Sequence, residues 1–482
     1  METKRYDAVV VGSGPNGLAA AITLQREGLS VLLLEGKSTI GGGMRTGELT
    51  LPGFQHDVCA AIHPMGAASP FLKSLPLQEF GLEYIHPEVL AAHPFDDGNA
   101  AALYQSLNAT AEGLGDDGAT YRKLFSPLVK AWPLIEHHVL GPMLKMPLNP
   151  RRLALFGMKS LQSGKGIAAR YKGKEARGLW AGIAAHGMIP LEAFTSSAIG
   201  FVLTIAGHRD GWPLSRGGSQ RIADALGGYF HSLGGTIQTD TMVEKLDNLP
   251  QASVILFDLS PRQLLDICGE RLSPFYRWQL NRHRYGMGVF KVDWALSEPV
   301  PFTAETARRA GTVHLGGTFE EIARGEREVW QGKHPDRPFV LFAQQSLFDE
   351  SRAPTGRHTG WAYCHVPNGS IQDMTDRITA QVERFAPGFQ DIILGINAVN
   401  TAAMERYNPN YIGGDINGGV INIAQLFNRP ALRFSPYRTS AKGIYICSAS
   451  TPPGGGVHGM GGYHAARQAL KDVFKIDVAL SR

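Results

Sequence analysis

Residues 7–34 carry a glycine pattern in a setting that strongly restricts the fold. Residues 7–11, DAVVV, form a continuous apolar run of the kind found in strands buried on both faces. Gly12-x-Gly14-x-x-Gly17 follows at once, then a helix-forming stretch at 18–27 and a second apolar run at 30–34. The sequence therefore predicts a strand–helix–strand unit whose turn holds the phosphates of a dinucleotide.

Each glycine of this turn has its own physical role. Gly12 permits the tight turn, Gly14 lets a diphosphate approach the backbone, and Gly17 lets the helix pack closely on the strand. The phosphates then lie at the helix N-terminus, where free N–H groups and the helix dipole favour anions. Glu35 stands 18 residues after Gly17. We expect it to accept hydrogen bonds from the adenosine ribose, which argues against a 2′-phosphate there.

The composition excludes several classes of protein. In 482 residues, 43% are hydrophobic and 19% are charged, which predicts a large buried interior and not disorder. A net charge of +4 gives no argument for nucleic acid as a partner. The cysteines at 59, 268, 364 and 447 form no C-x-x-C motif, so neither a redox dithiol nor a metal site is predicted. With a polar start at 1–6 that does not fit a signal peptide, we expect a cytoplasmic protein.

Two stretches bear on membrane contact. Residues 178–208 carry almost no charge, but Pro190 and Glu192 interrupt them, so we expect buried helix and not a membrane span. Residues 145–174 contain eight basic residues and no acid, interleaved with apolar side chains. This segment is either a solvated basic face or a peripheral contact with anionic lipid, and the sequence leaves both open.

The end of the chain repeats the opening pattern. A strand at 443–448 leads into Gly454-x-Gly456-x-x-Gly459, and a helix follows at 462–474. Only 23 residues remain after Gly459, too few for a second complete strand–helix–strand unit. We therefore expect this turn to contact the far end of the first dinucleotide. A long dinucleotide held at both ends favours FAD over NAD.

The fold class predicted from these patterns is α/β. A Rossmann-like FAD domain is expected from residues 1–69, 212–284 and 436–482, with strands at 236–239 and 253–258. A mixed α+β substrate domain is expected from residues 70–211 and 285–435, including a helix at 375–385.

Motifs along nearly the whole chain resemble those of phytoene desaturase-like FAD oxidoreductases. They are the N-terminal fingerprint, Gly-Gly-x-Met-Arg-Thr at 41–46, Gly-Gly-Ser at 217–219, Gly-Gly-Asp at 413–415 and Pro-Gly-Gly-Gly-Val-His-Gly-Met at 453–460. The subgroup typified by pyridine nucleotide-disulfide oxidoreductase domain-containing protein 2 is the most similar. The resemblance implies a glutathione reductase-like FAD domain.

The resemblance also implies site residues. Val243 would hold the adenine through backbone hydrogen bonds, and residues 457–460 would lie at the pyrimidine edge of the isoalloxazine. His458 is the candidate for a titrating, catalytic group beside the flavin, unless it only shapes the turn. The ADP half would contact Gly12, Gly14, Gly17, Glu35, Gly43 and Arg45. The remaining predicted cofactor contacts are Pro15, Asn16, Gly36, Gly42, Met44, Ser260, Gly455, Gly456, Val457, Gly459 and Met460.

The activity so implied is that of an oxidoreductase with non-covalent FAD. Hydride would pass between flavin N5 and a carbon of an apolar substrate, isoprenoid or lipid-like, with oxygen, a quinone or NAD(P) as electron acceptor. A redox-neutral isomerase or a saturase would use the same fold and flavin. The rival from another class is a flavin-free prenyl-binding protein similar to Rab GDP-dissociation inhibitors. Glu35 and the complete C-terminal glycine turn favour a flavin protein.

Overall fold

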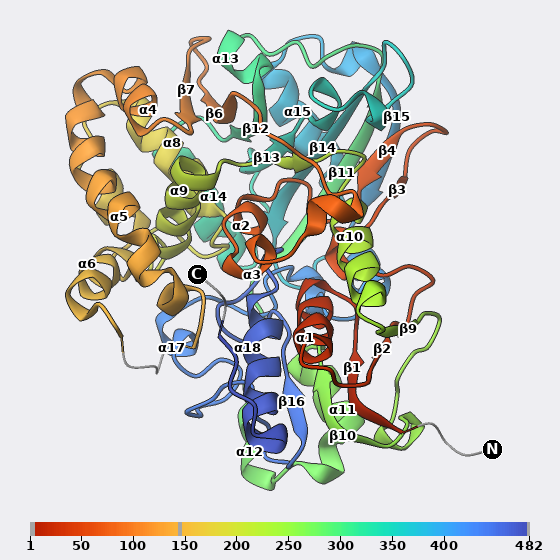
Figure 1. Ribbon diagram of the computed structural model, residues 1–482. Helices are drawn as coiled ribbons and strands as arrows, with labels where there is room; N and C mark the ends of the chain where they lie inside the picture. The colour runs from red at the N-terminus through yellow and green to blue at the C-terminus, as the bar shows by residue number, and fades with distance from the viewer. Residues whose placement is uncertain (1–4, 143–146, 480–482) are drawn as a thin grey trace.

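The computed structural model describes residues 5–142 and 147–479, with its two main sheets toward opposite ends of the molecule (Figure 1). The start of the basic segment, residues 145 and 146, lies outside the described residues. So do residues 1–4 of the polar N-terminal stretch.

The first sheet is parallel and has helices on both faces. Its strand order is β16–β10–β1–β2–β9. In β1, Ala8 and Val10 pack toward α1, α10 and α18, whereas Val9 and Val11 pack toward α11 and α12. This two-sided burial explains the continuous apolar run. The bounds are β1 (Tyr6–Val11), β2 (Val31–Leu34), β9 (Thr236–Gln238), β10 (Ala252–Phe257), β16 (Ile444–Ile446), α1 (Pro15–Gln25), α10 (Gln220–Ser232), α11 (Pro261–Cys268), α12 (Pro274–Asn281) and α18 (Met460–Ala469).

The second sheet has seven strands in the order β15–β11–β14–β13–β12–β6–β7. Neighbouring strands are antiparallel except β12 and β6, which are parallel. One face packs into an apolar core with α15 (Thr375–Phe385). The strands are β6 (Val89–Pro94), β7 (Ala100–Tyr104), β11 (Gly288–Leu296), β12 (Ala310–Leu315), β13 (Val340–Ala343), β14 (His358–Val366) and β15 (Ile393–Val399).

A group of helices lies beside this sheet (Figure 1). The nearly uncharged segment 178–208 forms most of α8 and most of α9, and its helical residues are largely buried. In the part of the chain that is described, no helix is long and apolar enough to cross a membrane. The group comprises α4 (Leu107–Gly113), α5 (Gly118–Val139), α6 (Pro150–Ser160), α7 (Gly164–Ala168), α8 (Lys174–Ala185), α9 (Ala198–Asp210) and α14 (Phe319–Trp330).

Short elements connect the two halves. Strands β3 (Thr46–Glu48) and β4 (Gln55–Asp57) form one two-stranded sheet, and β5 (Tyr84–Ile85) and β8 (Leu214–Ser215) form another. The short helices are α2 (Pro64–Ala67), α3 (Pro70–Lys73), α13 (Glu305–Arg308), α16 (Thr401–Tyr407) and α17 (Ile423–Leu426).

The element bounds differ from the sequence prediction mainly at glycine turns. Helix α1 begins at Pro15, three residues early, because proline fits the first helical position. Helix α18 begins at Met460, directly after Gly459, and its last part is a π-helical turn at Leu470–Phe474. The strands of each sheet come from the segments assigned to the corresponding domain. The domain boundaries themselves stay a prediction.

Candidate active site

The Gly12–Gly17 turn has the close contacts that its pattern requires. Gly12 has φ +95°, and a Cβ there would lie 3.0 Å from the Asp258 carbonyl oxygen. A Cβ on Gly17 would lie 1.9 Å from the Gly12 carbonyl oxygen, so any other residue would separate α1 from β1. Gly14 precedes α1, whose first N–H groups have no partner within the helix. The turn therefore presents backbone donors to an anion.

Glu35 follows β2 and holds this turn in place. Its Oε2 accepts hydrogen bonds from both Ser13 N, at 3.1 Å, and Ser13 Oγ. Its Oε1 accepts from Lys37 N, at 2.9 Å, and lies 3.2 Å from Arg45 Nη2. Arg45 in turn donates to the carbonyl oxygens of Thr39 and Gly42. A ribose at Glu35 would therefore replace one of these partners.

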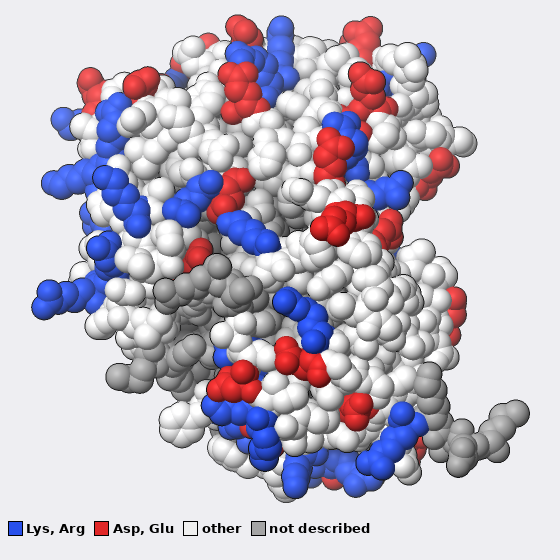
Figure 2. All heavy atoms as spheres, in the orientation of Figure 1, with Lys and Arg blue, Asp and Glu red and all other residues white. Residues whose placement is uncertain are grey.

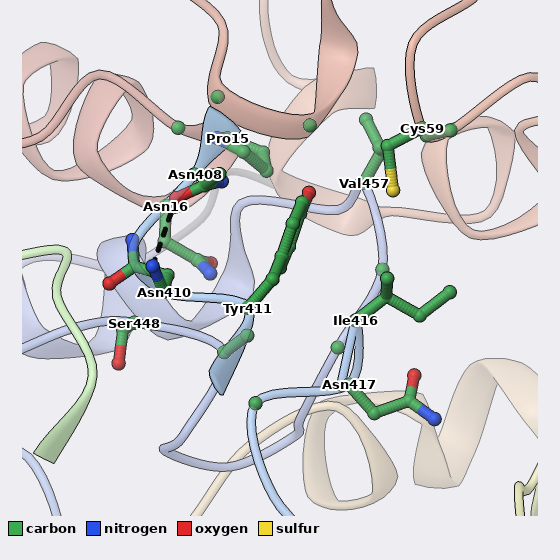
Figure 3. A pocket seen from close by; sticks show the side chains of 18 of the residues that line it. Pro15, Asn16, Cys59, Asn408, Asn410, Tyr411, Ile416, Asn417, Ser448 and Val457 are labelled. Carbon is green, nitrogen blue, oxygen red and sulfur yellow. Dashed lines mark hydrogen bonds between the residues drawn. The ribbon is translucent and has the colours of Figure 1, made fainter. Parts of the chain in front are cut away.

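A cavity of about 400 Å³ begins at this turn and reaches the second sheet. Figure 3 shows Tyr411 and Asn410 beside Pro15 and Asn16, with Cys59 and Val457 across the same space. Asn410 N donates a hydrogen bond to Asn408 Oδ1, and Ser260 N donates one to Asn410 Oδ1. The predicted contacts that line the cavity are Gly12, Gly14, Pro15, Asn16, Glu35, Gly36, Gly42, Gly43, Arg45, Val243, Ser260, Gly455, Gly456, Val457 and His458.

The other end of the cavity has walls from the second half of the molecule. Ile199, Val202 and Leu203 of α9 supply apolar surface. Strands β12, β13 and β14 supply Thr312, Leu341, Trp361 and Tyr363. The cavity therefore joins a nucleotide-type turn to a largely apolar chamber, which is the arrangement needed to bring a cofactor and a substrate together.

Three predicted contacts besides Gly17 do not line the cavity. Met44 and Met460 are fully buried in the core of the molecule. Gly459 has φ +67°, and a Cβ there would lie 2.8 Å from the Ala19 Cβ of α1. Met44 and Met460 therefore do not line the predicted cofactor site, and Gly459 lets α18 pack on α1. Gly17 also does not line the cavity, in keeping with its packing role.

His458 lines the cavity but is only 1% exposed. Its Nδ1 accepts a hydrogen bond from Met460 N at 3.1 Å. Burial lowers the pKa of His458 to about 4, so the imidazole is neutral near pH 7. This environment disfavours a titrating, catalytic role for His458 near pH 7 and favours the turn-shaping alternative.

Residues 10–75 match the NAD(P)-binding Rossmann-like domain model. The chain is 25% identical to pyridine nucleotide-disulfide oxidoreductase domain-containing protein 2 of Rattus norvegicus, covering 97% of this chain and 94% of the relative. It is 24% identical to a limonene dehydrogenase component from Castellaniella defragrans, covering 98% and 96%. It is 21% identical to a lycopene-forming phytoene desaturase of Paracoccus sp., covering 98% of both chains. The chain is a full-length homologue of oxidoreductases.

Solved structures of oxidoreductases have a fold similar to that of this chain. An oxidoreductase from Methanosarcina mazei superposes with a TM-score of 0.63 at 16% identity, covering 97% of this chain and all of that one. A redesigned putrescine oxidase gives the same TM-score and identity, covering 98% and 99%. The oxidoreductase therefore has a mixed α/β fold with a Rossmann-like dinucleotide-binding domain, of the type seen in flavin amine oxidases and desaturases.

The residues of this oxidoreductase homologue fit FAD. The glycine turn and the N-terminus of α1, Gly12 to Asn16, line the cavity, so backbone N–H groups there can hold a diphosphate. Glu35 faces the cavity at the carboxyl end of β2, where an adenosine ribose would lie. The C-terminal turn lines the same cavity through Gly455, Gly456 and Val457, so it can contact the far end of the same dinucleotide.

Asp258 is a cavity residue of the oxidoreductase that the sequence patterns did not identify. It is 6% exposed, and its Oδ2 accepts the Gly17 N–H at 2.9 Å. Burial raises the pKa of Asp258 to about 7, and the charge of Glu35 acts in the same direction. One sequence signal was available: Asp258 directly follows the apolar run at 253–257. Only the structure shows that this strand, β10, pairs in parallel with β1. The segment 407–411, which includes Tyr411, carried no comparable signal.

Proposed function

We propose that this protein is an FAD-dependent oxidoreductase that moves hydride between a carbon of an apolar substrate and the flavin. The observation that carries the proposal is the cavity shared by the Gly12–Asn16 turn and the apolar wall of α9. When bound, the flavin accepts or donates the hydride at N5.

The residues of the chain bind and orient both reactants. Backbone N–H groups at Gly14 and Asn16 hold the diphosphate, and Glu35 accepts the ribose hydroxyls. Val243 lies 7% exposed at the adenine end of the cavity, where its backbone would hold the base. The apolar side chains of α9 exclude water from the reacting carbon. Oxygen, a quinone or NAD(P) would serve as electron acceptor.

The substrate end does not distinguish oxidation from reduction or isomerisation, so the saturase and redox-neutral isomerase remain alternatives within the same proposal. The flavin-free prenyl-binding protein is the alternative from another class. Apolar walls alone would suit it, but the glycine turn at the start of α1 and Glu35, which both line the cavity, support a dinucleotide.

The absorption spectrum of the purified protein tests the proposal. We expect a flavin spectrum, and FAD released into the supernatant on denaturation. Glu35→Ala should weaken FAD binding by roughly 10- to 150-fold, because charge-assisted hydrogen bonds worth about 1.5–3 kcal/mol are lost. Glu35→Gln keeps the size of the side chain and removes its charge, and Glu27→Ala, an exposed site on the same unit, is the control. A colourless protein that binds no added FAD would refute the proposal and leave the binding-protein alternative.

We further propose that the basic segment contacts anionic lipid. Figure 2 shows Lys and Arg along the left edge of the molecule, over α5 and α6. Among residues 5–142 and 147–479, no ion pair involves Arg151, Arg152 or Lys159. Exposed apolar side chains lie near them: Met158 is 63% exposed and Phe194 is 72% exposed. Hydrogen bonds from Ser197 to the carbonyls of α6 keep the Phe194 loop beside that helix. Positive charge around apolar side chains suits a lipid surface.

A further inference from the structure

A clasp, residues 405–411, borders one end of the cavity. It comprises the end of α16 and the stretch after it, and it comes from the second half of the molecule, because α16 follows the edge strand β15. Residues 407–411 all line the cavity, as does the glycine turn. Figure 3 shows Asn408 and Asn410 of the clasp beside Pro15. The clasp and the glycine turn therefore border the same space, where the diphosphate would lie.

The clasp is bonded to the glycine-rich segment that follows β2. Tyr407 Oη donates a hydrogen bond to the carbonyl oxygen of Gly42 at 3.1 Å. The Arg45 guanidinium lies 5.7 Å from the centre of the Tyr407 ring. Gly42 itself is so close to the glycine turn that a Cβ there would lie 3.0 Å from the Gly14 Cα. The bond from Tyr407 therefore fixes the clasp directly beside the diphosphate position.

Further bonds join the clasp to the segment after β10. Asn410 Nδ2 donates to the carbonyl oxygen of Asp258 at 3.1 Å, and Ser260 N donates to Asn410 Oδ1 at 2.8 Å. Glu405 forms an ion pair with Arg262 of α11. The clasp is therefore attached to the FAD half at its start, at Tyr407 and near its end.

These attachments are polar and close to solvent. Arg406 is exposed, and the other clasp residues are half-buried. The side chains of Arg262 and Glu405 are 53% and 30% exposed, and an ion pair so accessible to water adds little stability. Tyr411 is the one clasp residue that packs against an apolar core. Segments held mainly by such contacts open locally while the rest of the chain stays folded.

A dinucleotide in this cavity would be enclosed by the clasp at its middle. The adenosine would lie at Glu35 and the flavin ring at Val457, with the diphosphate between them at Gly14. A ring system would then lie on each side of the point where the clasp crosses. FAD could not slide out lengthwise without drawing one of its ring systems under the clasp, and it could not leave sideways while the clasp is closed.

We propose that the clasp controls the loading and release of FAD, which enters and leaves only while residues 405–411 are open. This inference rests on the proposed function, because it assumes FAD in the cavity. Weakening the clasp makes the open form more frequent with and without FAD, so the association and dissociation rates rise by the same factor and the affinity stays the same. Loss of an ordinary contact to FAD would raise the dissociation rate alone.

The two rates of FAD binding test the proposal. Association is followed by flavin fluorescence after mixing with flavin-free protein, and dissociation by exchange of bound radiolabelled FAD against an excess of unlabelled FAD. Tyr407→Phe removes the bond to Gly42 and keeps the ring beside Arg45, and it should raise both rates by about two- to tenfold. Arg262→Ala removes the ion pair at a residue that does not line the cavity, and it should raise both rates by about two- to fivefold.

Matched controls remove the same groups elsewhere on the FAD half. Tyr229→Phe, in α10, and Arg271→Ala, after α11, should change neither rate. An unchanged association rate in both clasp variants would overturn the proposal, and so would a rise in the dissociation rate alone. Protein that binds no FAD at all would overturn the proposed function together with this inference, whereas unchanged rates with normal binding would overturn this inference alone.

Trypsin gives a readout that needs no cofactor. Arg406 lies in the last turn of α16, so the protease can cleave after it only when the clasp opens. In flavin-free protein, Tyr407→Phe and Arg262→Ala should speed this cleavage by the same factors by which they speed FAD association. The cleavage product is followed by mass spectrometry. Cleavage as slow as in wild type, beside faster FAD association, would show that another segment admits the cofactor, and the proposal would be wrong.

Discussion

Replacing Asp258 with asparagine should stabilise the flavin-free protein at neutral and alkaline pH. The carboxyl lies at the turn that would hold the diphosphate: its Oδ2 would be 2.6 Å from a Cβ on Gly14. Burial is the main cause of its raised pKa, about 7 against an ordinary 3.8. Asparagine keeps an acceptor for the Gly17 N–H and removes the charge.

The direction of the stability change with pH follows from the proton that Asp258 binds in the folded chain. Between about pH 4 and pH 7 the folded chain holds a proton on Asp258 that the unfolded chain has lost. Stability from this group therefore falls as pH rises through that window and is constant above it. Three pKa units correspond to about 4 kcal/mol at most. An amide N–H₂ left without a partner would cost about 1–3 kcal/mol, so a net gain of about 1–3 kcal/mol is expected.

The assay is the melting temperature of both proteins, freed of flavin, between pH 4 and pH 9. Asp258→Asn should melt roughly 3 °C higher at pH 8 and equal to or below wild type near pH 4. Asp57→Asn is the matched control. Burial acts to raise the pKa of that carboxyl, but Arg352 and the Ser219 N–H lower it overall, so its loss should destabilise the protein at pH 8.

FAD binding gives a second readout for the same reasoning. A diphosphate beside Asp258 favours the protonated carboxyl, so FAD affinity should fall as pH rises above about 7 in wild type. Asp258→Asn should remove that dependence. A variant less stable than wild type at pH 8, with FAD affinity still falling above pH 7, would refute the assigned protonation state.

Two further predictions concern the C-terminal turn and the basic segment. Gly456 lines the cavity at φ +121°, a backbone conformation that alanine rarely adopts. Gly456→Ala should therefore move the backbone away from the flavin. The two-electron reduction potential of the flavin should fall by about 30 mV, which corresponds to one lost hydrogen bond. Gly454→Ala, at φ +118° with open space around it, is the control. Equal shifts in the reduction potentials of both variants would show that the turn does not contact the flavin. Binding to anionic vesicles should fall as salt rises and be lost on charge reversal at Arg151, Arg152 and Lys159. Reversal at Arg271 and Arg277, on the other half of the molecule, should have little effect, and absence of binding at low salt would identify a solvated face.

The sequence by itself determined the local unit around the glycine turn. A buried parallel strand is apolar along its whole length, and the contacts of Gly12 and Gly17 leave no room for a side chain, so pattern and structure correspond closely there. The same unit located Glu35, because this residue directly follows its second apolar strand, β2. Helix α15 was also predicted at its observed bounds, since its amphipathic spacing is local.

Only the tertiary structure decided which residues share the cavity. Asp258 reaches the turn through the pairing of β10 with β1, a contact between residues more than 240 positions apart. Gly459 looked equivalent to Gly456 in sequence, but α18 packs so closely on α1 that Gly459 faces a helix instead of the cavity. The cavity wall opposite the turn arises from the register of β12, β13 and β14, which brings Thr312, Leu341 and Tyr363 to one face. Such contacts depend on how distant segments pair, and local sequence patterns do not specify that pairing.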